Sequence, residues 1–432
     1  MHSGAGQAGL TVGARLKSFG VKSLIIDTAK HVGDSWRERY DNLTLHDSVY
    51  FSHMPYLPFP ATWPIFMPKD KFADWLQAYA QIMDLTVWND TRLESAQWSG
   101  ETKSWLVKIT RRQVEGTAIS RTFQVNVSLQ YHLHKDVTDA IKHLIQATGV
   151  SGEPNLPTNL PGFETFSGSK IIHSSQFRSA LPSHNQNKRA IIVGSCNSAH
   201  DIAQNCYLNG YDVTMIQRSP TIVHAANSAH TTLSSLYGED SPPIEDADLM
   251  LVSLPSSVLR VINAVSTKVQ DQLDEQMLQG LKRVGFRLDN DEGGMIMKYL
   301  QRGGGYHLDL GSSQFVIDGK VKLKHGGVIE VVPNGVKLDN GETVEGDEII
   351  FATGYRNMTT TTAKILGSAV ADKVNSVWGL DEEGEIRTLW RKSGHPGLWM
   401  MGGTLVLCRY FSRVLALQIT GLEAGLYNYD DI

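Results

Sequence analysis

Gly4-Ala5-Gly6-Gln7-Ala8-Gly9 decides the fold, because its three glycines have the GxGxxG spacing and lead directly into residues 10–19. Apolar residues recur at helical intervals in that segment, which predicts a helix. Such a turn lets the backbone approach the pyrophosphate of a dinucleotide, since glycine has no Cβ and the helix N-terminus is partly positive. A bare GxGxxG is weak evidence, and the alternative is an ordinary glycine-rich turn.

The elements after this turn favour a cofactor site. Val21–Ile26 is a short apolar run that predicts a buried parallel strand. Asp27 follows at its end, twenty-three positions after Gly4, where an acid hydrogen-bonds a ribose hydroxyl. An acid repels a 2′-phosphate at this place, so the unit suits FAD. We predict FAD contacts from Gly4, Gly6, Gln7, Ala8, Gly9 and Asp27.

A second strand–turn–helix–strand unit begins at Ala190. Its turn reads Gly194-Ser195-Cys196-Asn197-Ser198-Ala199, with Cys196 in place of the middle glycine and Ala199 in place of the third. Taken alone, this turn fits nucleotide binding and an ordinary tight strand–helix turn equally. Arg218, twenty-four positions after Gly194, favours binding, because a guanidinium there can hold the 2′-phosphate of NADPH. We predict NADPH contacts from Gly194, Ser195, Asn197, Ser198 and Arg218.

Together the two units predict an α/β fold with two Rossmann-like dinucleotide-binding domains, one for FAD and one for NADPH. We expect residues 1–160 to form the first part of the FAD-binding domain, 161–345 the NADPH-binding domain, and 346–432 the second part of the FAD-binding domain. Residues 234–300 predict a largely helical insertion in the NADPH-binding domain. A Pro/Asn-rich stretch at 154–161 is typical of a connector between domains.

Further segments stand in an order that resembles the class B flavin-dependent monooxygenases, the flavin-containing and YUCCA-like group, and particularly their filamentous-fungal forms. The segments are Gly33-Asp34-Ser35-Trp36-Arg37-Glu38-Arg39-Tyr40, Leu45-His46-Asp47, Ala147-Thr148-Gly149, Phe351-Ala352-Thr353-Gly354-Tyr355 and Met401-Gly402-Gly403. The resemblance covers nearly the whole chain. It implies that Gly33, Trp36, Arg37, His46 and Thr148 lie beside FAD, and that Thr353 and Gly354 lie near the junction of the two cofactors.

The resemblance also implies the chemistry. In this family NADPH reduces FAD, the reduced flavin adds O₂ to form a C4a-hydroperoxide, and the distal oxygen passes to a small organic substrate. We therefore expect an NADPH-dependent FAD monooxygenase, with no catalytic side chain assigned. Many members carry an asparagine near the positions of His46 and Asp47, and none is evident here. A disulfide reductase of the same architecture would need a pair of redox cysteines, which the sequence lacks.

One departure from the family motivates a second interpretation. Family members begin with an apolar strand, whereas only Met1-His2-Ser3 precede the first glycine here, so we expect the first domain to lack its initial strand. Losing three large buried side chains would remove about 5–9 kcal/mol, comparable to the stability of a whole domain. The alternative function is a catalytically impaired protein that binds NADPH or FAD, with a regulatory role or none.

Two more segments depart from the family pattern. Residues 127–142 show neither strand alternation nor turn chemistry, and we interpret them as a translated retained intron; a surface insertion is the alternative. The fingerprint F-x-G-x-x-x-H-x-x-x-[FY] is nearly matched by Phe166, Gly168, His173 and Phe177, with one extra residue before the histidine. We expect His173 to shape the entrance of the NADPH-binding domain rather than to catalyse.

Composition limits the partners and the location. The net charge of −5 argues against nucleic acid, and the longest apolar runs, 249–254 and 398–407, are too short to span a bilayer. The three cysteines, Cys196, Cys206 and Cys408, have no spacing typical of a disulfide scaffold or a zinc site, which favours the cytosol. Tyr50, Phe51 and Trp63 are candidates for a substrate pocket, although aromatic residues more often lie in a core.

Overall fold

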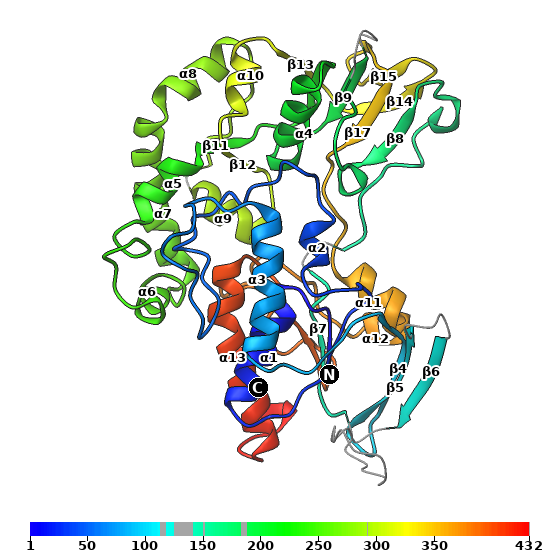
Figure 1. Ribbon diagram of the computed structural model, residues 1–432, viewed down its shortest axis with the longest axis vertical. Helices are drawn as coiled ribbons and strands as arrows, with labels where there is room; N and C mark the ends of the chain where they lie inside the picture. Colours follow the sequence, from blue (N-terminus) through cyan, green and yellow to red (C-terminus); the bar gives the residue numbers. More distant parts are fainter. Residues whose placement is uncertain (113–117, 125–140, 150–151, 183–187, 292, 432) are drawn as a thin grey trace.

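The computed structural model describes residues 1–112, 118–124, 141–149, 152–182, 188–291 and 293–431. Two five-stranded parallel sheets organise this part of the chain, and they lie in different regions of the molecule (Figure 1). The first sheet has the order β18-β7-β1-β2-β3 and the second the order β13-β10-β9-β17-β8. Each sheet contains one of the two predicted strand–turn–helix–strand units, so the predicted α/β fold is confirmed.

The first sheet has short strands. They are β1 His2–Ser3, β2 Ile25–Ile26, β3 Val87–Trp88, β7 Leu144–Gln146 and β18 Leu398–Met400. The predicted strand at 21–26 therefore forms only at its last two residues. Three helices of this half are α1 Gln7–Ser18, α3 Lys69–Ile82 and α13 Leu405–Glu423, and a short helix α2 spans Asp34–Arg37.

The initial strand of the first sheet is shortened rather than missing, which corrects the expectation from the sequence. His2 and Ser3 pair in parallel with β2 on one side and with β7 on the other. Three backbone bonds extend this pairing: Ile145 N–H to Met1 O, Ala147 N–H to Ser3 O, and Gly4 N–H to Ile26 O, each 2.8 Å. Two residues suffice because the ladder depends on backbone groups and not on apolar side chains.

His2 occupies the place of an apolar core residue. Its side chain is fully buried, and its Nδ1 lies 3.3 Å from the carbonyl oxygen of Gly9. Its Nε2 has no hydrogen-bond partner among the described residues. Burial lowers the pKa of this imidazole to about 3, so the ring is neutral at physiological pH.

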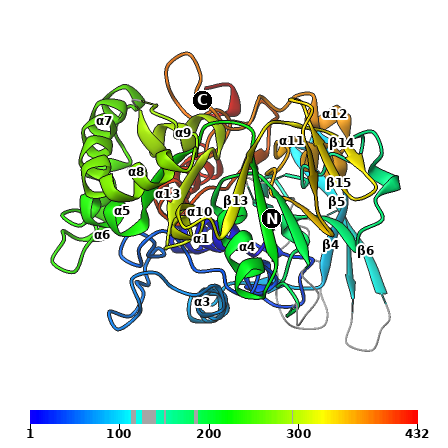
Figure 2. The ribbon, with the colours of Figure 1, turned by 90° about the horizontal axis from the view of Figure 1, so that it is seen from above.

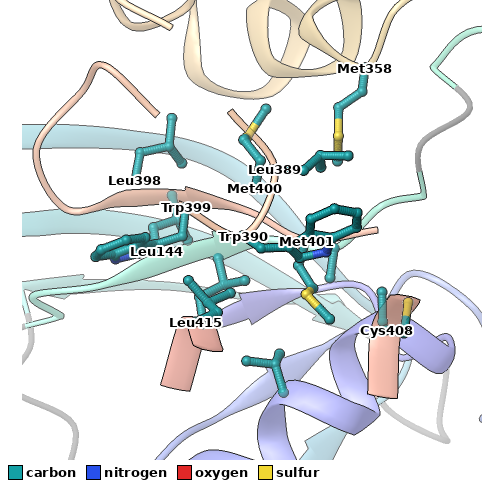
Figure 3. Close-up of a cluster of buried hydrophobic side chains, with 14 of the residues drawn as sticks. Leu144, Met358, Leu389, Trp390, Leu398, Trp399, Met400, Met401, Cys408 and Leu415 are labelled. Carbon is teal, nitrogen blue, oxygen red and sulfur yellow. The ribbon is translucent and has the colours of Figure 1, made fainter. Parts of the chain in front are cut away.

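The first sheet and α13 share a large apolar core. Helix α13 packs along α1, and its buried side chains include Cys408 and Leu415. Figure 3 shows part of this cluster, in which Leu144 of β7 and Trp399 of β18 meet residues of α13. This core compensates for the few hydrogen bonds of β1, because apolar burial is the main favourable term in folding.

The second sheet has longer, apolar strands. They are β8 Lys170–His173, β9 Arg189–Val193, β10 Asp212–Gln217, β13 Val321–His325 and β17 Glu348–Phe351, with helix α4 Asn197–Leu208 after β9. Ile191 and Ile192 are fully buried, as expected for a central parallel strand. The limits 1–160, 161–345 and 346–432 stay a prediction; β17 pairs with β9 and β8, so the chain leaves the second sheet only after Phe351.

Helices gather beside the second sheet. They are α5 Ala226–Leu233, α6 Ile244–Leu251, α7 Ser256–Leu273, α8 Glu275–Arg283 and α9 Gly294–Arg302, which agrees with the largely helical character predicted for 234–300. Seen from above, they lie on the opposite side of the molecule from β4 Thr91–Ser99, β5 Ser104–Arg112 and β6 Ala118–Gln124 (Figure 2). The pair β11 Ile222–Ala225 and β12 Tyr306–Asp309 connects the helices to the second sheet.

Smaller elements complete the described chain. Hairpins form at Asn334-Gly335 and Asn340-Gly341, between β14 Val328–Val332, β15 Gly335–Leu338 and β16 Thr343–Glu345. The short helices are α10 Ser313–Ile317, α11 Thr359–Leu366 and α12 Ser368–Ala371, with 3₁₀ turns at Phe163–Thr165, Ser174–Gln176 and Tyr429–Asp431. The predicted intron, 127–142, lies outside the described residues except for its last two.

Helix α13 is long and apolar enough, by length and composition, to cross a membrane, and half of the relevant window is buried inside the protein. Helices α6 and α7 meet the same criterion only when taken together, and they are bent by 101° relative to each other. Because α13 packs against α1 and the first sheet, its apolar character is explained by its place in the core.

Candidate cofactor and substrate site

The first glycine turn has the backbone geometry of a phosphate-binding turn. Gly4 has φ +117°, and a Cβ at this position would overlap the carbonyl oxygen of Ala147. A Cβ on Gly9 would overlap the carbonyl oxygen of Gly4, so this glycine allows α1 to approach the turn closely. Gly6 caps α1, and the nearest atom to a Cβ there is Ser35 Oγ at 3.9 Å. The turn is therefore closed on the protein side and open at Gly6, where a pyrophosphate would approach.

Asp27 is fixed beside this turn. Its Oδ2 accepts a hydrogen bond of 2.6 Å from the Ala5 N–H, and its Oδ1 accepts one of 2.8 Å from the Ala29 N–H. The side chain is half-buried at the carboxyl end of β2. A carboxylate has about four lone-pair sites, so two remain for the hydroxyls of a ribose.

The segment that follows β2 lies against the same turn. Gly33 adopts φ +92° before α2, and a Cβ there would overlap the backbone of α3. Trp36 Nε1–H donates to Gln7 Oε1 at 3.1 Å, which joins two of the predicted FAD contacts. Arg37 instead donates to Asp34, Asp74 and Gln77 and to the Val32 carbonyl. These contacts give Arg37 a scaffolding role, and its predicted contact with FAD stays a prediction.

Thr148 closes the turn from the other side. The backbone of Ala147 and Thr148 lies directly against Gly4, and the Thr148 hydroxyl accepts a hydrogen bond of 3.2 Å from Gln146 Nε2. The structure thus brings Thr148 to the first turn, while Ala8 is buried in α1 behind it; the predicted contact of Thr148 with FAD stays a prediction.

The second turn repeats the geometry of the first despite its degenerate sequence. Gly194 has φ +132°, donates its N–H to Ile216 O at 2.9 Å, and a Cβ there would overlap the carbonyl oxygen of Ala352. Gly4 makes the corresponding bond to Ile26. Cys196 occupies the middle position, and burial raises the pKa of its thiol, so it is a neutral side chain at pH 7.

Polar side chains of the second turn are held by neighbouring strands. Ser195 Oγ lies 2.8 Å from Thr221 Oγ1, and Asn197 Oδ1 accepts a hydrogen bond of 2.8 Å from the Leu308 N–H. The hydroxyl of Ser198 is a hydrogen-bond partner of Tyr40. These contacts orient the start of α4, whose free N–H groups suit a phosphate.

Arg218 stands at the end of β10 with an exposed side chain. Within the described part of the chain, no acid and no carbonyl is paired with its guanidinium. The corresponding residue of the first unit is Asp27, so the two units carry opposite charges at equivalent places. An unpaired guanidinium there is suited to the 2′-phosphate of NADPH.

Thr353 and Gly354 lie where β17 ends between the two sheets. Thr353 Oγ1 donates to Asn155 O at 2.7 Å, and the carbonyl oxygen of Gly354 lies 2.8 Å from His173 Nε2. His173 is buried, and its Nδ1 accepts the Ser175 N–H at the start of a short 3₁₀ turn. Its contacts are those of the structural residue that the sequence predicted.

A polar contact joins the two halves near His46. Asp201 of α4 accepts a hydrogen bond of 2.7 Å from the Tyr40 hydroxyl, and its Oδ2 lies 3.3 Å from His46 Nε2. Asn42 donates to the Asp201 carbonyl at 3.2 Å. Asp201 could not be identified from the sequence, because an acid within a helix is usually solvent-exposed.

A cavity of about 330 Å³ opens beside this contact. Its walls come from the loop at His46–Phe51, from helices α5, α6, α7 and α9, from the segment 252–254, from β12, from residues 380–386 and from the first half of α13. Aromatic and aliphatic side chains dominate the lining; they include Phe51, Leu259, Met295, Ile296, Tyr299, Leu300, Tyr306, Leu407, Tyr410 and Phe411. An enclosed apolar volume with a few polar groups is typical of a small-molecule site.

Asp47 is one of the two acids in this lining, with Glu385. Burial raises the pKa of its carboxyl, and the neighbouring His46 opposes the shift. Burial also raises the pKa of the Tyr299 and Tyr306 hydroxyls, and the negative charge of Asp47 adds to it in both. Both phenols therefore stay protonated and can donate hydrogen bonds into the cavity.

Of the three aromatic residues that the sequence suggested for a substrate pocket, only one lines this cavity. Phe51 lines it, whereas Tyr50 stacks on His230 at 5.9 Å between ring centres and Trp63 stacks on Phe59 at 5.3 Å. The remaining lining residues come from segments far apart in the chain. Among the described residues, no cluster of three or more His, Cys, Asp or Glu side chains has a geometry that would hold a metal ion.

Comparison with known proteins places these features in context. A family model described as FMO-like, flavin-binding monooxygenase-like, matches residues 28–362. The probable indole-3-pyruvate monooxygenase YUCCA1 of Arabidopsis thaliana is 27% identical over 355 residues, which cover 82% of this chain and 74% of that protein. The match to the family model begins after the first glycine turn, so that turn rests on its own geometry.

Solved structures share the fold over nearly the whole chain. A flavin-containing monooxygenase from Stenotrophomonas maltophilia superposes with a TM-score of 0.60 at 18% identity, covering 98% of this chain and 97% of that one. OTEMO in complex with FAD and NADP superposes with a TM-score of 0.61 at 15% identity, covering 98% and 85%. At such identities the likeness shows the fold alone.

Proposed function

Because the chain belongs to the flavin-binding monooxygenase-like family, we propose that it is an NADPH-dependent FAD monooxygenase that transfers one oxygen atom of O₂ to a small organic substrate. The observation that carries the proposal is the pair of glycine turns with the same backbone geometry, one followed by Asp27 and the other by the unpaired Arg218. The difference in charge assigns a different dinucleotide to each turn.

The residues at the first turn fit FAD. Gly4 and Gly9 have no room for a Cβ on the protein side, whereas Gly6 is open. Gly6, Gln7 and Ala8 would present N–H groups at the start of α1 to the pyrophosphate, and Asp27 would bind the ribose. FAD supplies the oxygen chemistry when bound. Gly33, Trp36, His46 and Thr148 surround this turn and complete the proposed FAD site, with Arg37 supporting it from behind.

The residues at the second turn fit NADPH. Gly194 lets the chain turn tightly, and Ser195, Asn197 and Ser198 bring the start of α4 toward a pyrophosphate. Arg218 would bind the 2′-phosphate. Thr353 and Gly354 stand between the two sheets, where the two cofactors would meet. The family relation and the solved OTEMO structure with FAD and NADP support this pairing of cofactors.

The cavity gives the substrate its place. Its lining is mostly aromatic and aliphatic, and a site from which water is excluded protects reactive oxygen chemistry from hydrolysis and proton leakage. The Tyr299 and Tyr306 hydroxyls can orient a polar group of the substrate, and His46 links the cavity to α4 through Asp201. No side chain is assigned the role of catalytic acid or base.

A cytosolic location completes the proposal. Cys196, Cys206 and Cys408 are free thiols, and two of them are fully buried. Such cysteines are typical of proteins from a reducing compartment.

A second function is favoured by one observation, the two-residue strand β1 with the buried His2. A protein that binds FAD weakly through this strand would be a catalytically impaired, NADPH-binding protein. The colour of the purified protein distinguishes the two functions. We expect purified protein to be yellow, to bleach with NADPH and to regain its colour in air; colourless protein that still binds NADPH would favour the second function.

A further inference from the structure

The charges that face the substrate cavity are of one sign. The lining contains two acids, Asp47 and Glu385, and two histidines, His46 and His230, and no lysine or arginine is found among the lining residues that the structure describes. Burial lowers the pKa of His230, so that ring is neutral at pH 7. His46 lies beside Asp201, whose carboxylate would balance a positive charge on the imidazole.

Two arginines that stand next to lining residues in the chain are held by groups outside the lining or by its backbone. Arg409 precedes the lining residue Tyr410, but its guanidinium makes two bonds of 2.6 and 2.7 Å to Asp248 and donates to the carbonyls of Phe51 and His53. Arg387 follows the lining residue Ile386 and donates to the carbonyl oxygen of Trp378. Asp248 balances the charge of Arg409, whereas Arg387 keeps its charge but is held by the carbonyl of a residue outside the cavity lining.

Asp47 lies beside His46, whose imidazole is also next to the Asp201 carboxylate. None of the described residues donates a hydrogen bond to the Asp47 carboxylate, although the residue is half-buried and lines the cavity. An acid left without a donor in an apolar cavity repels a second negative charge strongly, because the low dielectric there does little to screen it. Glu385, which is exposed at the edge of the same cavity, adds to the field along the approach.

We propose that Asp47, assisted by Glu385, selects the charge of the substrate, so that the cavity accepts apolar molecules that are uncharged or cationic and rejects organic carboxylates. This inference rests on the proposed function. It also separates this chain from its relatives, since indole-3-pyruvate, the compound in their names, is a carboxylate at neutral pH. The relation to those proteins therefore gives the chemistry of the family but not the substrate.

The test uses two ligands that share a benzyl ketone, one of which is an anion and the other uncharged. Phenylpyruvate and phenylacetone share the benzyl group and the ketone, and a carboxylate in the first replaces a methyl group in the second. Their dissociation constants would be measured with the flavin-loaded protein at pH 8, from the change in flavin absorbance and independently from tryptophan fluorescence. We expect phenylpyruvate to bind at least about tenfold more weakly, as for two like charges within a poorly screened site.

Three variants sharpen this test. Asp47→Asn should narrow the ratio of the two dissociation constants by about tenfold, mainly by strengthening phenylpyruvate binding. Glu385→Lys, at an exposed position that tolerates exchange, should shift the ratio in the same direction and serves if Asp47→Asn does not fold. Glu383→Gln, exposed outside the cavity lining, is the matched control and should leave the ratio unchanged.

Each outcome decides the inference. Equal or tighter binding of phenylpyruvate by the unmodified protein overturns it, as does the absence of any effect in both Asp47→Asn and Glu385→Lys. Failure of both ligands to bind at millimolar concentration overturns the assignment of the cavity. Bleaching of the flavin by NADPH without any ligand is recorded in the same samples, so a failure of the proposed function is seen separately.

Discussion

The unit β1–α1–β2 and the unit β9–α4–β10 form the same type of turn, but they differ in glycine content and in strand length. The first has all three glycines of its motif, but its two strands contain only two residues each. The first residue of β1 is the buried His2. The second has lost two of the three glycines, but its strands contain five and six residues with fully buried isoleucines. Gly4 and Gly194 nevertheless hold the same bond to the neighbouring strand and the same close contact with a carbonyl.

This difference separates what shapes a dinucleotide turn from what stabilises it. The shape depends on one glycine with positive φ and on the strand ends that it joins, and both units keep these. Stability depends on the sheet and the core beneath it, which the first unit takes largely from α13 and β18. The identity of the cofactor depends on a third element, the charge after the next strand, which is negative at Asp27 and positive at Arg218.

The largest expected effect comes from closing one turn at a time. Gly4→Ala places a Cβ against Ala147 O at a strained φ, which should destabilise the turn by about 3 kcal/mol or more and remove most of the bound FAD. Gly194→Ala should spare the flavin and abolish NADPH binding. Flavin content and NADPH affinity would be measured for both, with Gly100→Ala, which meets no atom within 4 Å, as control. Full flavin retention in Gly4→Ala would contradict the assignment of FAD to the first turn.

The next effect concerns the charge that distinguishes the units. Arg218→Gln should weaken NADPH binding by about 10- to 100-fold and leave NADH binding unchanged, because a charge-assisted contact with the 2′-phosphate is lost. Calorimetric titration with both nucleotides measures it, and Arg283→Gln, an exposed arginine of α8, is the control. Equal losses for NADPH and NADH would contradict the role given to Arg218.

A smaller effect is expected at the weak strand. His2→Val should stabilise the protein by about 1–3 kcal/mol, since it replaces a buried group with an unpaired nitrogen by an apolar one. The reverse exchange in the second unit, Ile191→His, should destabilise it. Thermal or denaturant unfolding with flavin release as a second signal measures both. A destabilised His2→Val would show that the bond of His2 to Gly9 matters more than its burial.

His2 also predicts the dependence of stability on pH. Its pKa is about 3 in the folded protein and near 6.5 when unfolded, so between these values the unfolded state binds more protons. Protonation of His2 therefore does not reduce the free energy of unfolding above pH 6.5, and it reduces that free energy increasingly as the pH falls toward 3. Unfolding measured from pH 7 to pH 4 should show a steeper loss for the unmodified protein than for His2→Val. Identical slopes would argue against a buried neutral imidazole.

The smallest effect is expected where the two halves meet. Tyr40→Phe removes a bond of 2.7 Å to Asp201 and should cost about 1 kcal/mol, with a weaker response of NADPH binding to bound flavin. Tyr211→Phe removes the bond of 3.2 Å to Glu348 within the second sheet and is the matched control. If both variants change the coupling between the cofactors equally, the contact at Asp201 has no special role.

Much of the fold could be predicted from the sequence, because short patterns of residues determine the turns and the elements beside them. The two glycine turns and the strands and helices beside them follow from residue types at short spacing. The strand β1 was not predictable, because backbone pairing with β2 and β7 stabilises it and its side chains do not show it. The helix of the second unit begins at Asn197, so polar residues of the turn already belong to it.

The substrate cavity shows the limit of sequence reasoning most clearly. Asp47, Tyr306 and Glu385 line one volume although they are far apart in the chain, and no local pattern connects them. Asp201 has a function at the junction only because Tyr40 and His46 reach it from the other half. Such sites arise from tertiary packing, so they become visible only after the two sheets are placed.

The most direct test of the division between the two units is anaerobic reduction of the bound flavin by NADPH and by NADH. We predict that the purified protein is yellow, that NADPH bleaches its flavin at a concentration at least tenfold lower than NADH does, and that Arg218→Gln removes this preference while Gly4→Ala removes the flavin itself. A flavin that either nucleotide bleaches equally well, or that neither reduces, would contradict the assignment of FAD to the first unit and NADPH to the second.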